Sequence, residues 1–160
     1  MSISIATGNS RANDLSSAQL SSLPSWAIES FDRAGLNAKY AFSTRVNPFY
    51  QRADFDGDGK MDLAILVSER ATGKVGIAFI MRSRPTWWVV GAGNPVGDHG
   101  DDFTWVDAWS VYERGPVEQG AGDGRPPKLK GEALLVEKTE AASALLWWDG
   151  KGISWYQQGD

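Results

Sequence analysis

The sequence predicts an α+β fold, in which a twisted, mainly antiparallel sheet of about seven to nine strands is joined by one N-terminal helix. Short runs of apolar and β-branched residues recur along the chain, and turns rich in Gly, Pro and Asp separate them. The chain contains eight Trp and 18 Gly. Aromatic side chains favour strands and glycine favours tight turns, so both support a β-rich fold.

One helix is expected near the N-terminus, over residues 24–34. Pro24 suits the first turn of a helix, where its missing N–H costs nothing, and Ser22 is placed to cap that turn. Ala27 and Phe31 are four residues apart and therefore share one face of the helix. We expect this face to pack on the sheet.

The rest of the pattern predicts strands and turns. The expected strands cover residues 38–46, 49–53, 63–67, 75–81, 87–93, 103–111, 132–138, 143–148 and 153–157. The segment 149–152 has strong hairpin chemistry, because its two glycines tolerate positive φ. These strands fit an antiparallel meander towards the C-terminus.

The chain is expected to form one domain preceded by an arm. Residues 1–14 are polar and lack periodicity, so they predict a flexible N-terminal arm. Residues 15–160 predict a single β-rich domain, because a chain of this length suits one core. The segment 113–130 is rich in Gly, Pro and charge and predicts a long surface loop.

The bulk composition excludes several classes of function. The formal net charge is −4, and no cluster of Lys and Arg is present, so nucleic acid is not expected as a partner. The longest apolar runs are too short to span a bilayer. The chain has no cysteine, which excludes disulfides and cysteine-ligated zinc.

One acidic loop carries the chemistry of this sequence. Asp54, Asp56 and Asp58 lie two residues apart, so alternate side chains can turn inward onto one ion. The backbone carbonyl of Lys60, at the seventh position, can add a neutral ligand. Asp62, at the ninth position, can close the shell directly or through water.

The ligand set predicts calcium. All the donors are oxygens, and a shell of about six favours Ca²⁺ over Mg²⁺, which usually keeps several waters. Four nearby carboxylates repel one another, so a cation is expected between them. We expect a structural ion, because a closed shell leaves no position for substrate. The alternative is an Asp/Gly turn without metal.

The segment DxDGDGxxDLAIL resembles the calcium loops of the FG-GAP and VCBS-type repeat families, in which the loop joins two β-strands. The resemblance covers residues 53–67 and rests on Asp54, Asp56, Asp58, Gly59 and Asp62. It implies a calcium site between two neighbouring strands. The motif occurs only once, whereas a propeller needs several blades, so a propeller is not expected.

The tryptophans predict a surface for a partner. Trp87 and Trp88 are adjacent, as are Trp147 and Trp148, and neighbours in a strand face opposite sides of the sheet. A small sheet rarely has both faces covered, so we expect at least one of these four side chains at the surface. A protein, or a carbohydrate, is the expected partner.

The only histidine, His99, lies in the segment GDHGDD. It could act as a general base or help to hold a second metal, but no nucleophile motif such as GxSxG accompanies it. A solvated polar loop is the simpler interpretation. The acid Glu132 is interpreted as a charge at the end of a strand.

These observations favour a non-enzymatic, calcium-stabilised β-rich binding module. Two alternatives stay open: a bacterial immunity or inhibitor protein that neutralises a toxin or hydrolase, and a metal-dependent hydrolase acting on sugar or phosphate through the carboxylates around Asp54 or Asp102. The loop lacks an acid at its twelfth position, where Ile65 stands, so a modest calcium affinity is expected. A periplasmic or extracellular location is therefore favoured, with the leader absent from this chain, and a cytoplasmic location stays open.

Overall fold

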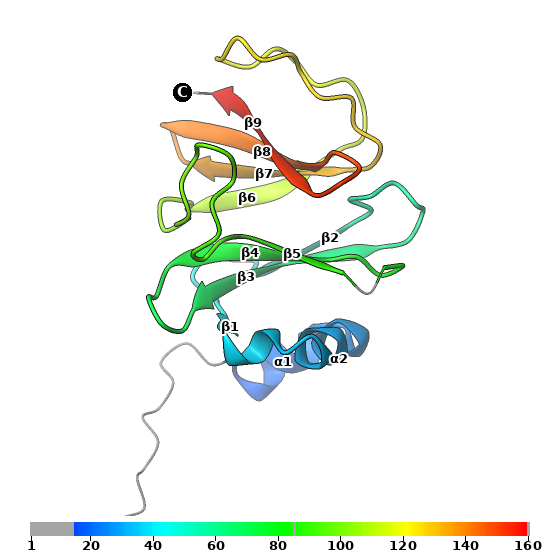
Figure 1. Ribbon diagram of the computed structural model, residues 1–160, viewed down its shortest axis with the longest axis vertical. Helices are drawn as coiled ribbons and strands as arrows, with labels where there is room; N and C mark the ends of the chain where they lie inside the picture. The colour runs from blue at the N-terminus through cyan, green and yellow to red at the C-terminus, as the bar shows by residue number, and fades with distance from the viewer. Residues whose placement is uncertain (1–14, 85, 160) are drawn as a thin grey trace, which may run out of the picture.

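The computed structural model describes residues 15–84 and 86–159, and in this part of the chain three layers are stacked (Figure 1). Helices cover one face of a five-stranded antiparallel sheet, and a four-stranded antiparallel sheet packs against its other face. The predicted α+β, mainly β class is confirmed, with nine strands in the described residues. The strands form two sheets instead of the single sheet that we expected, and their sandwich is not a propeller. The arm predicted for residues 1–14 lies outside the described residues.

The helical layer consists of α1 (Ser17–Ser22), α2 (Ser25–Arg33) and the short 3-10 helix η1 (Leu36–Ala38). The strands are β1 (Tyr40–Phe42), β2 (Tyr50–Ala53), β3 (Asp62–Glu69), β4 (Val75–Ile80), β5 (Trp87–Gly91), β6 (Ala108–Tyr112), β7 (Ala133–Lys138), β8 (Ala142–Trp148) and β9 (Ile153–Gly159). In the first sheet, β3 pairs with β4 on one side and with both β1 and β2 on the other, and β5 follows β4. The second sheet keeps the chain order from β6 to β9.

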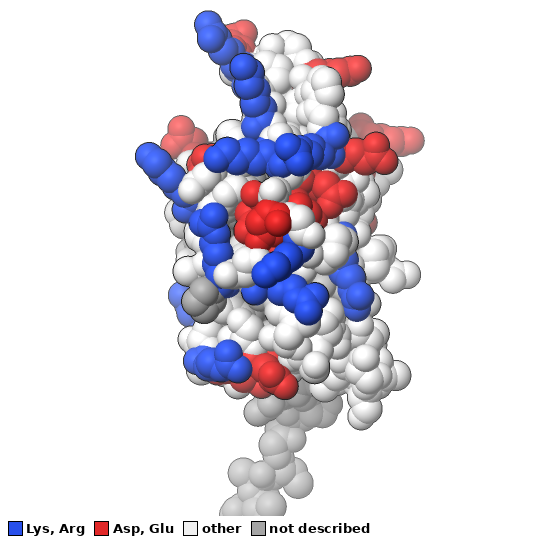
Figure 2. Space-filling view, turned by 90° about the vertical axis from the view of Figure 1, so that its right-hand side faces the viewer, with Lys and Arg blue, Asp and Glu red and all other residues white. Residues whose placement is uncertain are grey.

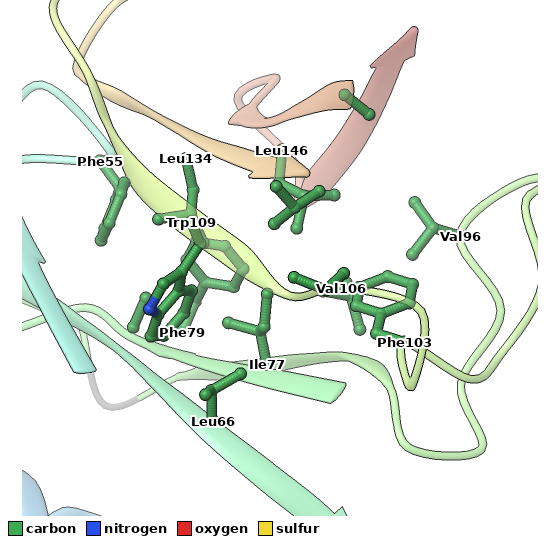
Figure 3. Close-up of a cluster of buried hydrophobic side chains, with 14 of the residues drawn as sticks. Phe55, Leu66, Ile77, Phe79, Val96, Phe103, Val106, Trp109, Leu134 and Leu146 are labelled. Atoms are coloured by element: carbon green, nitrogen blue, oxygen red, sulfur yellow. The ribbon is translucent and has the colours of Figure 1, made fainter. Parts of the chain in front are cut away.

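Strands β3 and β4 form the centre of the molecule and are buried along their whole length. Their sequences are almost continuously apolar because both faces of this sheet are covered. Leu63 and Ile65 belong to the apolar cluster between this sheet and the helices. Leu66 and Phe79 face the second sheet, where they meet Leu134 and other side chains of the main core (Figure 3).

Helix α2 matches the predicted helix to within one residue at each end, and its Ala27 and Phe31 are buried as expected. Its N-cap is Pro24, which has no side chain to cap the helix, so the capping role expected for Ser22 is wrong. Ser22 instead ends α1, a helix that the sequence did not predict. Helix α1 has six residues and buries none of them, so it leaves no apolar pattern to detect. None of the helices in the described segments is both long and apolar enough to cross a membrane.

The outer face of the second sheet is covered by the long segment between β6 and β7, which contains no helix or strand (Figure 1). Val117 of this segment packs with Leu145 of β8 and Tyr156 of β9. The face expected to be open on a small sheet is therefore covered.

Candidate metal centre

The acidic loop joins β2 to β3, which are antiparallel neighbours, and Ala53 pairs with Asp62 at its base. Gly57 and Gly59 have φ angles of 74° and 86°, in the left-handed region that glycine adopts without strain. The loop therefore turns tightly at the end of the first sheet. We call residues 54–62 the metal loop.

Three of the predicted ligands are brought together in the metal loop. Asp54, Asp56 and Asp58 each offer a carboxylate oxygen, and these oxygens all lie within 4.8 Å of one another. Figure 2 shows acidic side chains gathered near the middle of this end of the molecule, with Lys and Arg side chains around them. The cluster offers only oxygen donors, which suits a hard cation such as Ca²⁺.

Asp54 holds the curve of the metal loop. Its Oδ1 accepts the N–H groups of Gly57 at 2.9 Å and Asp58 at 3.1 Å, and its Oδ2 accepts the N–H of Gly59 at 2.8 Å. Asp58 in turn accepts the N–H of Lys60 at 2.9 Å. Each carboxylate oxygen has more than one lone pair, so Oδ2 of Asp54 and Oδ1 of Asp58 can accept these N–H groups and still bind an ion.

Asp56 is the carboxylate that the protein leaves unsatisfied. Its side chain is only 1% exposed, and its Oδ2 has no hydrogen-bond partner among the described residues. Nε of Arg84 is the nearest cationic atom, at 3.8 Å, which is too far for a hydrogen bond. Burial raises the pKa of Asp56, and the charge of Asp58 adds to this increase. A buried carboxylate oxygen without a partner is costly, and a bound cation would remove that cost.

Asp62 has a different role from the three clustered acids. It is 1% exposed, and it anchors the metal loop by accepting the N–H of Phe55 on Oδ2 at 3.0 Å and that of Arg82 on Oδ1 at 2.9 Å. Burial raises the pKa of Asp62 to about 7, although the N–H of Arg82 acts in the opposite direction. Its oxygens are not part of the three-carboxylate group. Ligation by Asp62 and by the carbonyl of Lys60 therefore stays a prediction.

The metal loop also joins the two sheets. The N–H of Asp54 donates to Oε2 of Glu132 at 2.8 Å, and the N–H of Glu132 donates to the carbonyl of Asp54 at 2.8 Å. A Cβ atom on Gly131 would collide with the backbone of Asp54, and one on Gly57 would collide with the backbone of Lys130. The loop of the first sheet is thus packed backbone to backbone on the residues that lead into β7 of the second.

Three neighbours of the cluster were not predicted from the sequence. Glu132 is 78 residues from Asp54 in the chain, and no local pattern links them. Ser83 and Arg84 follow β4, where a side-chain hydrogen bond from Ser83 lowers the pKa of Asp58. The only available signal was that two antiparallel strands, β3 and β4, bring their adjoining loops to one end of the sheet.

The acidic segment around His99 is arranged differently. His99 is exposed, and its ring stacks on Trp155 with the ring centroids 4.6 Å apart. Asp101 pairs with the ammonium group of Lys74 at 2.6 Å. Oδ1 of Asp102 accepts two backbone N–H groups, each at 3.0 Å. Asp101 and Asp102, two of the acids that could have held a second metal with His99, are thus engaged elsewhere.

The four tryptophans of the predicted partner surface do not share one face. Trp87 packs under the helices against Phe31, with the ring centroids 5.3 Å apart. Trp88 and Trp148 meet between the two sheets, and Trp147 packs beneath the long segment on the outer face of the second sheet. Trp148 is 4% exposed and the other three are half-buried. Their role in binding a partner stays a prediction.

The geometry therefore offers one candidate centre, built by three clustered carboxylates, anchored by Asp62 and attached to the second sheet through Glu132. Its interpretation depends on this chemistry alone, because the chain matches no protein-family model, no curated protein and no solved structure.

Proposed function

We propose that this chain is a non-enzymatic, calcium-stabilised β-sandwich module that binds a partner, with one Ca²⁺ held by Asp54, Asp56 and Asp58. The single observation that carries the proposal is Oδ2 of Asp56, which is buried and has no hydrogen-bond partner among the described residues. Native proteins rarely leave such an atom unpaired, and a bound ion is one standard reason for it. The surrounding donors are carboxylate oxygens, which are the ligands that Ca²⁺ prefers.

Calcium at this position would stabilise the junction of the two sheets. The ion would offset the mutual repulsion of the three carboxylates and hold the metal loop in its curved form. That form presents Asp54 to Glu132 and leaves room for Gly57 to lie against Lys130. By mass action, the free energy of unfolding would increase with calcium once the free calcium concentration exceeds the dissociation constant of the site.

The carbonyl of Lys60, Asp62 and water would complete the shell. A loop with Ile65 in place of an acid at its twelfth position should bind calcium with modest affinity, so it fills best where calcium is plentiful, which suits a periplasmic or extracellular protein. A protein or a carbohydrate is the proposed partner. Neither an inhibitor role nor a hydrolase role is favoured by a specific observation.

The substitution Asp56→Asn tests the proposal, because its effect on thermal stability should change sign with calcium. In calcium, the variant should melt at a lower temperature than the wild type, since it lacks a charged ligand. In EGTA it should melt at a higher temperature, since a neutral amide replaces an unpaired buried carboxylate that costs about 1–3 kcal/mol. Differential scanning calorimetry in the two buffers measures both effects.

Asp123→Asn is the matched control, because it removes a charge from an exposed position in the long segment over the second sheet. It should leave the melting temperature nearly unchanged in both buffers. The proposal is wrong if Asp56→Asn shifts the melting temperature equally in calcium and in EGTA.

A further inference from the structure

A hollow of about 390 Å³ lies between helix α2 and the segment that follows strand β4. Arg33 of the helix and Arg82 and Arg84 of the segment line it. The side chain of Trp26 and the hydroxyl groups of Ser30 and Ser83 complete most of the remaining wall. The hollow thus combines three cationic groups with two hydroxyl groups and an aromatic surface.

The charge of this hollow is strongly unbalanced. The only acid in its lining is Glu29, and the lining contains three arginines. In residues 15–84 and 86–159, Arg33 and Arg82 form no ion pair, and Arg84 has only the long contact with Asp56 at 3.8 Å. On a chain with a net charge of −4, such a concentration of cations is a local feature that composition does not explain.

Arg82 is held in place from two sides. Its guanidinium carbon lies 5.5 Å from the ring centroid of Trp26, and its backbone N–H donates to Asp62 at 2.9 Å. Guanidinium groups bind carboxylate and phosphate oxygens through paired N–H donors, and stacking on an aromatic ring keeps the planar group oriented. Hydroxyl groups can add further hydrogen bonds to the same oxygens.

We propose that this hollow binds the oxyanion of a ligand, a carboxylate or a phosphate group, between Arg33 and Arg82. The ring of Trp26 lies against the guanidinium group of Arg82, and Ser30 supplies a hydroxyl donor. This anion site would give the module a specific point of attachment for an acidic group on its partner. It needs no metal, because none of its donors belongs to the three-carboxylate cluster.

Ser83 and Arg84 line the hollow and also contact the metal loop. Ser83 hydrogen bonds to Asp58, and Arg84 lies beside Asp56. An ion on Asp56 would cancel the negative charge beside Arg84, and the positive charge of Arg84, which lines the hollow, would then be uncompensated. If the proposed calcium site is correct, calcium should therefore raise the affinity for the anion, and by linkage the anion should raise the affinity for calcium equally.

The test is an NMR titration that follows the Nε–H signals of the arginine side chains in the full chain. O-phosphoserine and glutarate serve as phosphate and carboxylate probes, and sodium chloride at matched ionic strength serves as the reference. In EGTA, at least one probe should produce saturable shifts at Arg33 and Arg82, with a dissociation constant on the order of 1 mM. The probe that binds more tightly identifies the preferred oxyanion.

Two variants and one control sharpen the test. Arg82→Gln and Arg33→Gln should each weaken the binding of the probe about tenfold, because each removes charge-assisted hydrogen bonds. Lys138→Gln removes the same charge from an exposed residue at the end of β7 and should leave the binding unchanged. Shifts that follow sodium chloride without saturating, or a loss in Lys138→Gln equal to that in Arg82→Gln, would overturn the anion site.

Repeating the titration in calcium tests the coupling. About fivefold tighter binding of the probe would support it, whereas equal binding in the two buffers would overturn it. Binding of the probe in EGTA supports the anion site whatever the metal loop does. A protein that binds the probe but no calcium would therefore contradict the proposed function and leave the anion site standing.

Discussion

Two loops of this protein are rich in Asp and Gly, yet in the described residues only one of them leaves a buried carboxylate oxygen without a hydrogen-bond partner. In the segment 98–102, Asp101 pairs with a lysine ammonium at 2.6 Å and Asp102 accepts backbone N–H groups. In the metal loop, Oδ2 of Asp56 is buried and has no hydrogen-bond partner in the described part of the chain. The two loops have similar amino-acid compositions, and they differ in the hydrogen-bond and ion-pair partners of their carboxylates.

The electrostatic consequences of this difference are also opposite. Burial raises the pKa of Asp102, but its hydrogen bonds with Thr104 and Val75 outweigh that effect and lower the pKa below the usual value. Burial raises the pKa of Asp56, and its hydrogen bond with Asp58 does not outweigh it. The carboxylate of Asp102 is stable with its charge present, while that of Asp56 is stabilised by a proton or a cation. Only the second loop therefore suits a metal.

The largest expected effect is that of Asp62→Ala, which removes the hydrogen bonds that anchor the metal loop. At about pH 6 the variant should lose about 3 kcal/mol of stability, because it leaves several buried N–H groups without an acceptor. The loss should already be present in EGTA and should be larger in calcium, where the shell also loses a ligand, as measured by urea unfolding. A loss seen only in calcium would instead make Asp62 chiefly an ion ligand.

The pH dependence of the calcium-free protein should be the next largest effect. The pKa of Asp62 is raised to about 7 in the folded state, so between about pH 4 and pH 7 the folded protein holds a proton that the unfolded chain has released. The stability contributed by this group is therefore fully present near pH 4 and is lost as the pH rises to about 7, on the order of 1 kcal/mol per pH unit.

Urea unfolding in EGTA across this range measures the pH effect. Asp62→Asn is the control, because it cannot titrate and should flatten the profile. In calcium the trend should be weaker, because carboxylate ligands bind the ion best when they are deprotonated. A wild-type stability in EGTA that increases from pH 4 to pH 7 would contradict the proposed role of burial.

The smallest effect is expected in the second acidic loop, where Asp102→Ala removes the acceptor of two backbone N–H groups. The variant should lose about 1–2 kcal/mol of stability, by the same amount in calcium and in EGTA. Thermal unfolding in the two buffers measures this. A loss of stability that depends on calcium would show that this loop also holds an ion, and the two loops would then not differ in metal binding.

Much of the fold and part of the site could be predicted from the sequence, because those features depend on nearby residues. The spacing of Asp54, Asp56 and Asp58 within one turn predicted their cluster correctly. The apolar runs of β3 and β4 predicted strands, and the spacing of Ala27 and Phe31 predicted the buried face of α2.

The features that escaped prediction depend on distant contacts. The division into two sheets places Glu132 against Asp54, and the loop after β4 places Arg84 beside Asp56. Neither neighbour has a local signature. The burial of Trp148 was missed for the same reason, since the covering of each sheet face is decided by elements far away in the chain.

Isothermal titration calorimetry of the chelator-treated protein with calcium chloride tests the central claim most directly. One ion should bind per chain, Asp56→Asn should weaken that binding at least tenfold, and Asp101→Asn in the other acidic loop should leave it unchanged. Absence of binding at millimolar calcium, or equal binding by the wild type and Asp56→Asn, would contradict a metal held at the buried carboxylate.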